Sequence, residues 1–166
     1  MNAIKQYHDS TCITFVERTI EKHYVVFKQG KGCYTTLGCV YQGLQTLSLG
    51  RGCEPEGTVV HELGHVLGCR HEQSRSDRDS FITVYENNII PAMLGQFNKT
   101  EEDEEILDTA YNTESIMHYG NYAFSKDPDN LKSMEALDGT PLLEPYEKPG
   151  LTQSDIDMIN KLYKCP

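Results

Sequence analysis

Three histidines and one glutamate between positions 61 and 71 have the types and spacing of a metal centre with a neighbouring base. His61 and His65 are four residues apart, so on a helix their imidazoles point from one face towards one ion. Glu62 would then lie beside the ion rather than on it. Gly68 adopts positive φ at little steric cost, and the turn that it permits can bring His71 back as a third ligand.

Three protein ligands leave an open position, which is typical of catalytic zinc. Zinc lowers the pKa of a bound water to about 7, and Glu62 can accept the proton as the hydroxide attacks a carbonyl carbon. Histidines that merely pack on a helix are an alternative, but this pattern arises by chance in roughly one of twenty thousand such chains. A purely structural zinc is disfavoured because such sites usually close with a fourth Cys or His. We therefore expect one Zn²⁺ per chain.

The overall composition limits the partners and the number of domains. The chain has 166 residues, a formal net charge of -10 and 38% hydrophobic residues. This length buries one sizeable core, so we expect a single domain over residues 1–166. Nucleic-acid binders need clustered Lys and Arg, so we expect no nucleic-acid partner. No apolar run approaches the ~20 residues that span a bilayer, so we expect no membrane insertion.

Six cysteines, none of them in a CxxC pair, favour disulfides over a cysteine-ligated metal. Many pairings are possible for six cysteines, so the residues alone leave the connectivity open. Disulfides indicate an oxidising compartment, and the sequon Asn98, Lys99, Thr100 agrees with secretion. We expect a secreted, extracellular protein.

Helices are predicted where apolar side chains recur at helical spacing. Residues 58–67 show this pattern and stop at Gly68, so they are predicted to form the helix that carries the first two histidines. A shorter helix is expected over 2–9. A terminal helix is expected after Thr152, whose pairing with Asp155 resembles a capping box.

Strands are predicted at 12–16, 24–27 and 46–49, which are rich in β-branched and aromatic residues or alternate polar with apolar ones. The segment 81–93 indicates a short strand or helix. Four prolines break the segment 121–150, so we expect a second half with little regular structure.

The segment HELGHVLGCRHE at 61–72, followed by SIMHYG at 115–120, resembles the astacin family of metzincin metallopeptidases. Glu72, directly after the third histidine, distinguishes this family from its metzincin relatives. The stretches QTLSLG and LTQSDIDMINKLY are further matches, and the resemblance covers essentially the whole chain. It implies an α+β fold: an N-terminal lobe (1–68) with a twisted mixed sheet and two helices, and a C-terminal lobe (69–166) that ends in a helix.

By this resemblance the protein is a zinc metalloendopeptidase, a hydrolase that cleaves peptide bonds in extended protein or peptide substrates. The zinc would be held by His61, His65 and His71. Tyr119 would be a further ligand that swings away to donate a hydrogen bond to the developing oxyanion. Met117 would form a Met-turn beneath the metal. On residue type alone, Met117 would be core and Tyr119 an ordinary buried tyrosine.

The resemblance also pairs Cys12 with Cys165 and Cys33 with Cys53. The first bond would tie the terminal helix back across the chain, and the second would close a loop beside a substrate-binding strand. That strand is predicted to be an exposed edge to which an extended peptide adds as another strand, with a plain edge strand as the alternative. Its residues are Gln45, Thr46, Leu47, Ser48 and Leu49.

Two features depart from the family. Cys39 and Cys69 stand where it usually carries other residues, which indicates either a third bridge between them or two free buried thiols. The sequence also begins late: Met1 already falls in the expected first helix, so the family's N-terminal strand is expected to be missing. In the family a released amino terminus lies near the residue that matches Glu72, and a chain that begins at Met1 would leave Glu72 without that cationic partner.

A catalytically silent or toxin-like binding module that keeps the fold is the alternative function. The complete set of ligands and the base argue against it. Another metzincin subgroup is a third interpretation, which Glu72 and SIMHYG disfavour. We expect a monomeric domain that is made as a zymogen.

Overall fold

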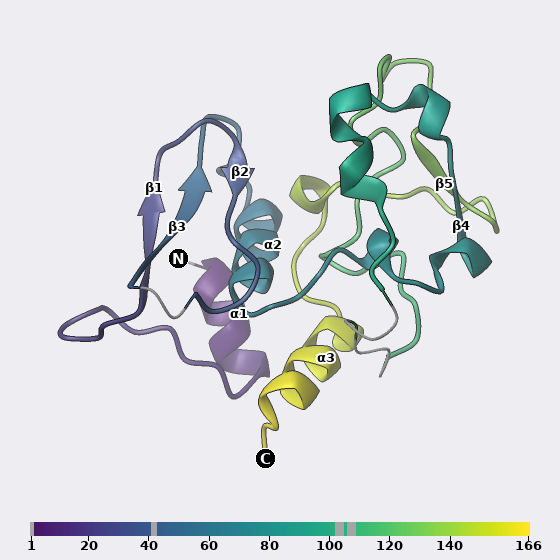
Figure 1. Cartoon of the computed structure of the whole chain (residues 1–166). Helices are drawn as coiled ribbons and strands as arrows, with labels where there is room; N and C mark the ends of the chain where they lie inside the picture. Colours follow the sequence, from purple (N-terminus) through teal and green to yellow (C-terminus); the bar gives the residue numbers. More distant parts are fainter. Residues whose placement is uncertain (1, 41–42, 102–104, 106–108) are drawn as a thin grey trace.

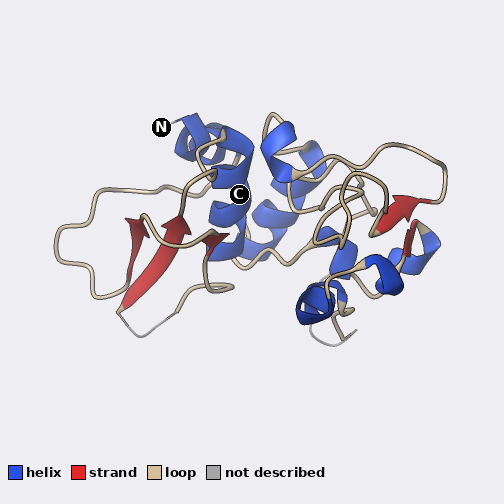
Figure 2. Cartoon of the chain, turned by 90° about the horizontal axis from the view of Figure 1, so that it is seen from above, coloured by secondary structure: helices blue, strands red, loops and turns tan. Residues whose placement is uncertain are grey.

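The computed structural model describes residues 2–40, 43–101, 105 and 109–166; Met1 is outside the described part. In Figure 1 the sheet of β1, β2 and β3 lies on one side with α1 and α2, β4 and β5 lie on the other, and α3 lies below. Figure 2 shows the same separation from above, with helices between the two groups of strands. None of the described helices is long and apolar enough to cross a bilayer.

The N-terminal sheet is mixed, as predicted. It consists of β1 (Tyr24–Lys28), β2 (Cys33–Tyr34) and β3 (Leu44–Leu49), in the order β1-β3-β2. β3 runs parallel to β1 and antiparallel to β2. The strands predicted at 24–27 and 46–49 are therefore confirmed.

The prediction that residues 45–49 form an exposed edge is wrong. β3 is the central strand, and its Leu47 and Ser48 are fully buried. Alternating polarity shows that one face of a strand is covered, but it does not show which strands lie on either side. The edges of the described sheet are β1 and the two-residue strand β2, and Cys33 and Tyr34 of β2 are both exposed.

Residues 12–16, also predicted as a strand, form an irregular segment after α1 (Asn2–Ser10). Side chains satisfy two of its amides: Ile13 N–H donates to Thr11 Oγ1 (3.1 Å) and Phe15 N–H donates to His8 Nε2 (2.8 Å). The composition of the segment suits a sheet, but a strand also needs a partner. In the described part of the chain no strand pairs with this segment.

Helix α2 (Glu56–Val66) carries the first two histidines and ends where the sequence predicts. Gly68 has a φ of +96°, and its N–H donates to His65 O at 3.0 Å. The N–H of Cys69 donates to Gly64 O at 2.9 Å. These two bonds form a Schellman motif, which turns the chain sharply after the helix.

Gly57, in the first turn of α2, permits a close backbone approach from the C-terminal half. An ideal Cβ at this position would lie 2.0 Å from Pro145 O and 2.6 Å from Lys148 O. Because both are backbone atoms, a methyl group fits only if the 145–148 segment moves. We expect Gly57→Ala to lower the free energy of unfolding by about 1–3 kcal/mol, measured by urea denaturation. Gly95→Ala is the control, since no described atom lies within 4 Å of an ideal Cβ there; equal losses in the two variants would contradict the expectation.

The C-terminal half has little regular structure, as predicted. In its described residues the strands β4 (Ile82–Val84) and β5 (Met134–Ala136) form an antiparallel pair over a second hydrophobic cluster. The segment predicted as a strand or helix thus begins with β4 and continues in short 3₁₀ helices. The 3₁₀ helices of the described chain are Glu72–Ser74, Arg78–Ser80, Glu86–Asn88, Pro91–Phe97 and Pro145–Glu147.

Helix α3 (Gln153–Tyr163) begins with the predicted capping box. Thr152 N–H donates to Asp155 Oδ2 (2.8 Å), and Asp155 N–H donates to Thr152 Oγ1 (3.4 Å). The helix contributes Ile159 to the main hydrophobic cluster, which also holds Leu63 of α2. Because this cluster draws residues from both sides of position 68, the division into lobes at 1–68 and 69–166 stays a prediction.

Two disulfides join the pairs that the family resemblance implies. Cys12 is bonded to Cys165, with the Cα atoms 5.5 Å apart, and Cys33 is bonded to Cys53, with the Cα atoms 5.7 Å apart. The first bond ties α3 to the segment after α1, and the second joins the edge strand β2 to the loop before α2.

The third bridge is absent: Cys39 and Cys69 are both free. Cys69 is 2% exposed within the main hydrophobic cluster, whereas Cys39 is exposed on a loop. The alternative of two free buried thiols is therefore correct that both thiols are free, but only Cys69 is buried. Burial raises the pKa of the Cys69 thiol to about 12, so it stays protonated and packs as a small apolar side chain.

Candidate metal centre and active site

The three predicted histidines converge. One ring nitrogen of each of His61, His65 and His71 lies within 4.8 Å of the other two, and the Nε2 atoms of His65 and His71 are 3.0 Å apart. Helix α2 supplies the first two, and the turn at Gly68 returns the chain so that His71 faces them. Nitrogens this close suit ligands of one ion.

Carbonyl oxygens fix the orientation of two of these rings. His61 Nδ1 bonds to Ile116 O and His65 Nδ1 to Cys69 O, both at 2.8 Å. Because a carbonyl only accepts, each Nδ1 carries the proton and each Nε2 is left with a lone pair. Burial, followed by the neighbouring His65, lowers the pKa of His61 to about 3, and burial also lowers the pKa of His65. Metal binding requires this neutral form.

Glu62 is a buried carboxyl next to the three histidines. Its side chain is 4% exposed, and Oε2 has no hydrogen-bond partner among the described residues. The carboxyl lines a cavity of about 250 Å³ together with His61 and Tyr119. Burial raises the pKa of Glu62 to about 7. Such an orphaned oxygen is rare in folded proteins, and a water held by a metal on the three imidazoles would supply its missing donor. The donor set therefore fits zinc.

Tyr119 lies next to two of the three histidines. Its ring centroid is 4.3 Å from that of His71 and 5.8 Å from that of His61. Its N–H donates to Gln73 Oε1 at 3.2 Å. Burial, together with the charges of Glu62 and Glu144, raises the pKa of Tyr119 well above its ordinary value. The phenol therefore stays protonated and can donate a hydrogen bond.

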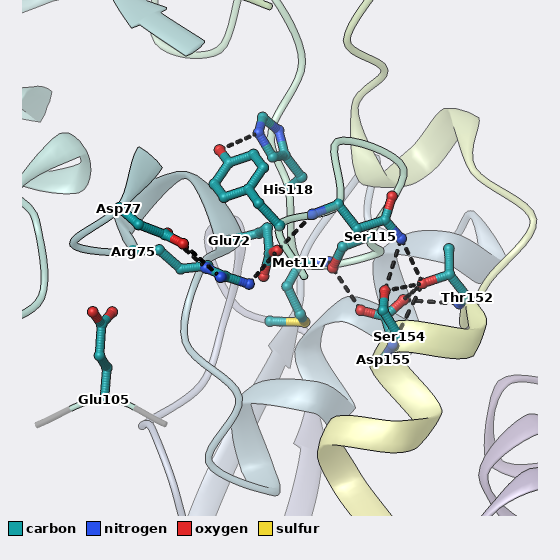
Figure 3. A network of polar contacts seen from close by, with 12 residues as sticks. Glu72, Arg75, Asp77, Glu105, Ser115, Met117, His118, Thr152, Ser154 and Asp155 are labelled. Atoms are coloured by element: carbon teal, nitrogen blue, oxygen red, sulfur yellow. Dashed lines mark hydrogen bonds and ion pairs between the residues drawn. The ribbon is translucent and has the colours of Figure 1, made fainter. Parts of the chain in front are cut away.

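Met117 lies in a turn beneath α2, at residues 115–118, which we call the Met-turn. It is 1% exposed, and its Sδ lies 2.6 Å from an ideal Cβ at Gly64, so glycine leaves room for it. Asp155 of α3 holds the turn: its carboxylate accepts from Ser115 Oγ (2.5 Å) and from Ile116 N–H (3.1 Å). Figure 3 shows the Met-turn between Asp155 on one side and Glu72 with Arg75 on the other.

Glu72 pairs with a cation from its own 3₁₀ turn, and the expectation about an amino terminus near Glu72 stays a prediction. Arg75 Nη1 donates to Glu72 Oε1 at 3.0 Å, and Asn112 N–H donates to the same oxygen at 2.9 Å. Arg75 also donates twice to Asp77. The N–H of Glu72 donates to Met117 O at 3.1 Å, which joins the end of the histidine motif to the Met-turn.

Two buried charged residues at the Met-turn, Asp155 and Lys148, could not be recognised as site residues from the sequence. The sequence pattern marks Asp155 only as a helix cap, and no local pattern marks Lys148. Lys148 is 6% exposed, and its Nζ donates to two carbonyls of the Met-turn. Their partners lie about thirty to forty positions away in sequence, so spacing along the chain does not reveal them.

A family model described as Astacin, a peptidase family, matches residues 1–164, and this range includes the three histidines and the Met-turn. The chain belongs to the astacin family. The resemblance carried by the histidine motif, Glu72 and SIMHYG is thereby confirmed.

Several astacin-family proteins are similar over almost the whole chain. "Astacin-like metalloprotease toxin 1" from Loxosceles intermedia is 44% identical over an alignment that covers 99% of this chain and 63% of that protein. "High choriolytic enzyme 1" from Oryzias latipes is 41% identical, over 98% of this chain and 59% of that protein. The chain thus spans less than two thirds of the length of these curated relatives.

Solved structures confirm the α+β fold. The hatching-enzyme zinc-protease High choriolytic enzyme 1 superposes with a TM-score of 0.91 at 40% identity, covering 99% of this chain and 80% of that chain. Myroilysin, at 21% identity and a TM-score of 0.65, shares the fold alone.

Proposed function

We propose that this astacin-family chain is a zinc endopeptidase that hydrolyses peptide bonds in extended protein substrates. The observation that carries the proposal is the buried Oε2 of Glu62, which has no hydrogen-bond partner among the described residues, next to three convergent imidazoles. His61, His65 and His71 would hold one zinc ion.

Zinc, when bound, polarises the scissile carbonyl and makes water a stronger acid. Glu62 would accept the proton of the attacking water at Oε2 and deliver it to the leaving amine nitrogen. The raised pKa of Glu62, about 7, suits a group that must both take and return a proton near neutrality. Tyr119, which stays protonated, would donate its hydroxyl hydrogen to the oxygen on which negative charge develops.

The edge strand β2 would receive the substrate backbone, in place of the buried β3. Cys33 of β2 lines the same cavity as His61 and Glu62. On its outer side β2 has no strand partner in the described sheet, so a peptide can add there by backbone hydrogen bonds. Cavity and edge together would hold an extended chain across the metal.

The test is digestion of casein or gelatin by the purified chain, with metal analysis of the same preparation. We expect proteolysis with one zinc per chain, and its loss with phenanthroline, because the chelator removes the metal that the three histidines hold. Re-addition of zinc should restore activity. Bound zinc without any digestion would contradict the proposal and favour the silent or toxin-like binding module.

We further propose that the protein acts outside the cell as a monomer. Its two disulfides suit an oxidising compartment. The relatives include proteins named as toxins. Size-exclusion chromatography and detection in the culture medium of expressing cells would test both points.

A further inference from the structure

Lys148 is an unusually buried cation. It directly follows the 3₁₀ helix Pro145–Glu147 and is 6% exposed. Its Nζ donates to Ser115 O at 2.8 Å and to His118 O at 2.6 Å. Lysine is rarely buried to this degree, because the ammonium loses its hydration, so bonds of this kind must compensate.

Both acceptors belong to the Met-turn. Ser115 O begins it and also accepts the turn-closing bond from His118 N–H at 3.0 Å. His118 O belongs to the peptide that directly precedes Tyr119. Lys148 thus holds the acceptor groups of the turn, while Asp155 holds its donors, Ser115 Oγ and Ile116 N–H. Charge-assisted bonds of this type are roughly twice as strong as neutral ones.

The backbone of Lys148 packs closely against the helix that carries the histidines. Lys148 O and Pro145 O lie so close to Gly57, near the start of α2, that an ideal Cβ there would be 2.6 and 2.0 Å from them. The backbone of Lys148 therefore lies against α2 while its Nζ bonds to the His118–Tyr119 peptide. One residue thus contacts both the histidine helix and the peptide before the tyrosine.

We propose that Lys148 is a positioning residue for Tyr119, holding the His118–Tyr119 peptide so that the phenol stays beside His71. This rests on the proposed function, in which Tyr119 donates to the oxyanion. Without the ammonium, His118 O loses this donor, and the peptide is held less firmly, through the bond from Tyr119 N–H to Gln73 Oε1. The histidines keep their own carbonyl partners, Ile116 O and Cys69 O. We therefore expect that replacing Lys148 slows the chemical step and leaves metal binding unchanged.

The first experiment is a double-variant cycle on the zinc-loaded protein, with an internally quenched peptide as substrate. We expect Lys148→Met, which keeps the length but has no N–H, to lower kcat about 10-fold to 100-fold with KM nearly unchanged. Tyr119→Phe should lower kcat at least as much, and the double variant should be no slower than Tyr119→Phe alone. Lys126→Met is the matched control, since Lys126 also donates to a carbonyl, Asn87 O, but on the exposed surface.

The second experiment uses no turnover. The visible spectrum of the cobalt-loaded protein reports the ligand geometry, and we expect Lys148→Met and Tyr119→Phe to change it alike, with metal stoichiometry unchanged. If Lys148→Met does not fold, Lys148→Gln, which retains an N–H donor, replaces it and should show a smaller loss in the same direction.

The outcomes separate the two proposals. A wild-type protein that binds zinc but cleaves nothing overturns the proposed function. If the wild-type protein is active, two results would overturn the role of Lys148 and leave the proposed function intact. One is a Lys148→Met variant with full kcat. The other is a double variant in which the kcat losses of Lys148→Met and Tyr119→Phe multiply.

Discussion

Replacing Glu62 by glutamine is expected to lower kcat for peptide hydrolysis by roughly 10²–10⁴-fold while the protein still binds one zinc ion. Glutamine has nearly the same shape, so the cavity shared with His61 and Tyr119 keeps its form. Its amide does not accept and return a proton as the carboxylate does. The proposed metal ligands are the histidines, so the zinc content should not fall. Steady-state kinetics and metal analysis on one preparation measure both quantities.

Glu54→Gln is the control for this substitution. Glu54 is exposed in the loop before α2, so its replacement makes the same chemical change away from the cavity. We expect the kcat of this variant to match the wild-type value. Full activity in the Glu62 variant would show that another group moves the proton, and a loss of zinc would show that Glu62 supports the metal instead.

Removing the bond between Cys12 and Cys165 should have the largest effect on stability. The bond spans 153 residues, and the chain-entropy model gives about 5 kcal/mol for a loop of that length. The bond between Cys33 and Cys53 spans 20 residues, for which the same model gives about 3 kcal/mol. Serine pairs at each site, compared by guanidinium denaturation, test the order of the two losses.

Equal losses at the two sites would argue against a loop-length effect. They would indicate that the stabilisation comes from packing around each bond or from structure that persists in the unfolded chain. The two serine variants serve as controls for each other, because each removes one disulfide and adds two hydroxyl groups.

Structural features that depend on residues close together in the sequence were predictable from it. The spacing of His61 and His65, the stop at Gly68 and the capping box of Thr152 with Asp155 all depend on contacts within a few positions. The structure has each of them. Helices are local structures, so their ends and faces follow from local patterns.

Features that depend on distant partners were not predictable. The polarity pattern of β3 is that of a half-buried strand, but its position at the centre of the sheet depends on the two-residue strand β2. Residues 12–16 have the composition of a strand and lack a partner in the described structure. Lys148 resembles any charged residue between prolines, and only the folded chain places its Nζ against Ser115 and His118.

The backbone of Ile116 shows why the histidine motif does not suffice as a metal chelator. Its N–H donates to Asp155 of α3 and its C=O accepts from His61 of α2, so the backbone of one residue links two helices distant in sequence. A synthetic peptide of residues 56–71 would keep all three imidazoles but lack this link. Its rings would sample many orientations and tautomers, and zinc would have to order them on binding. The excised motif would therefore be a weak and unselective ligand, and a transplanted site would need the Ile116 and Asp155 counterparts as much as the histidines.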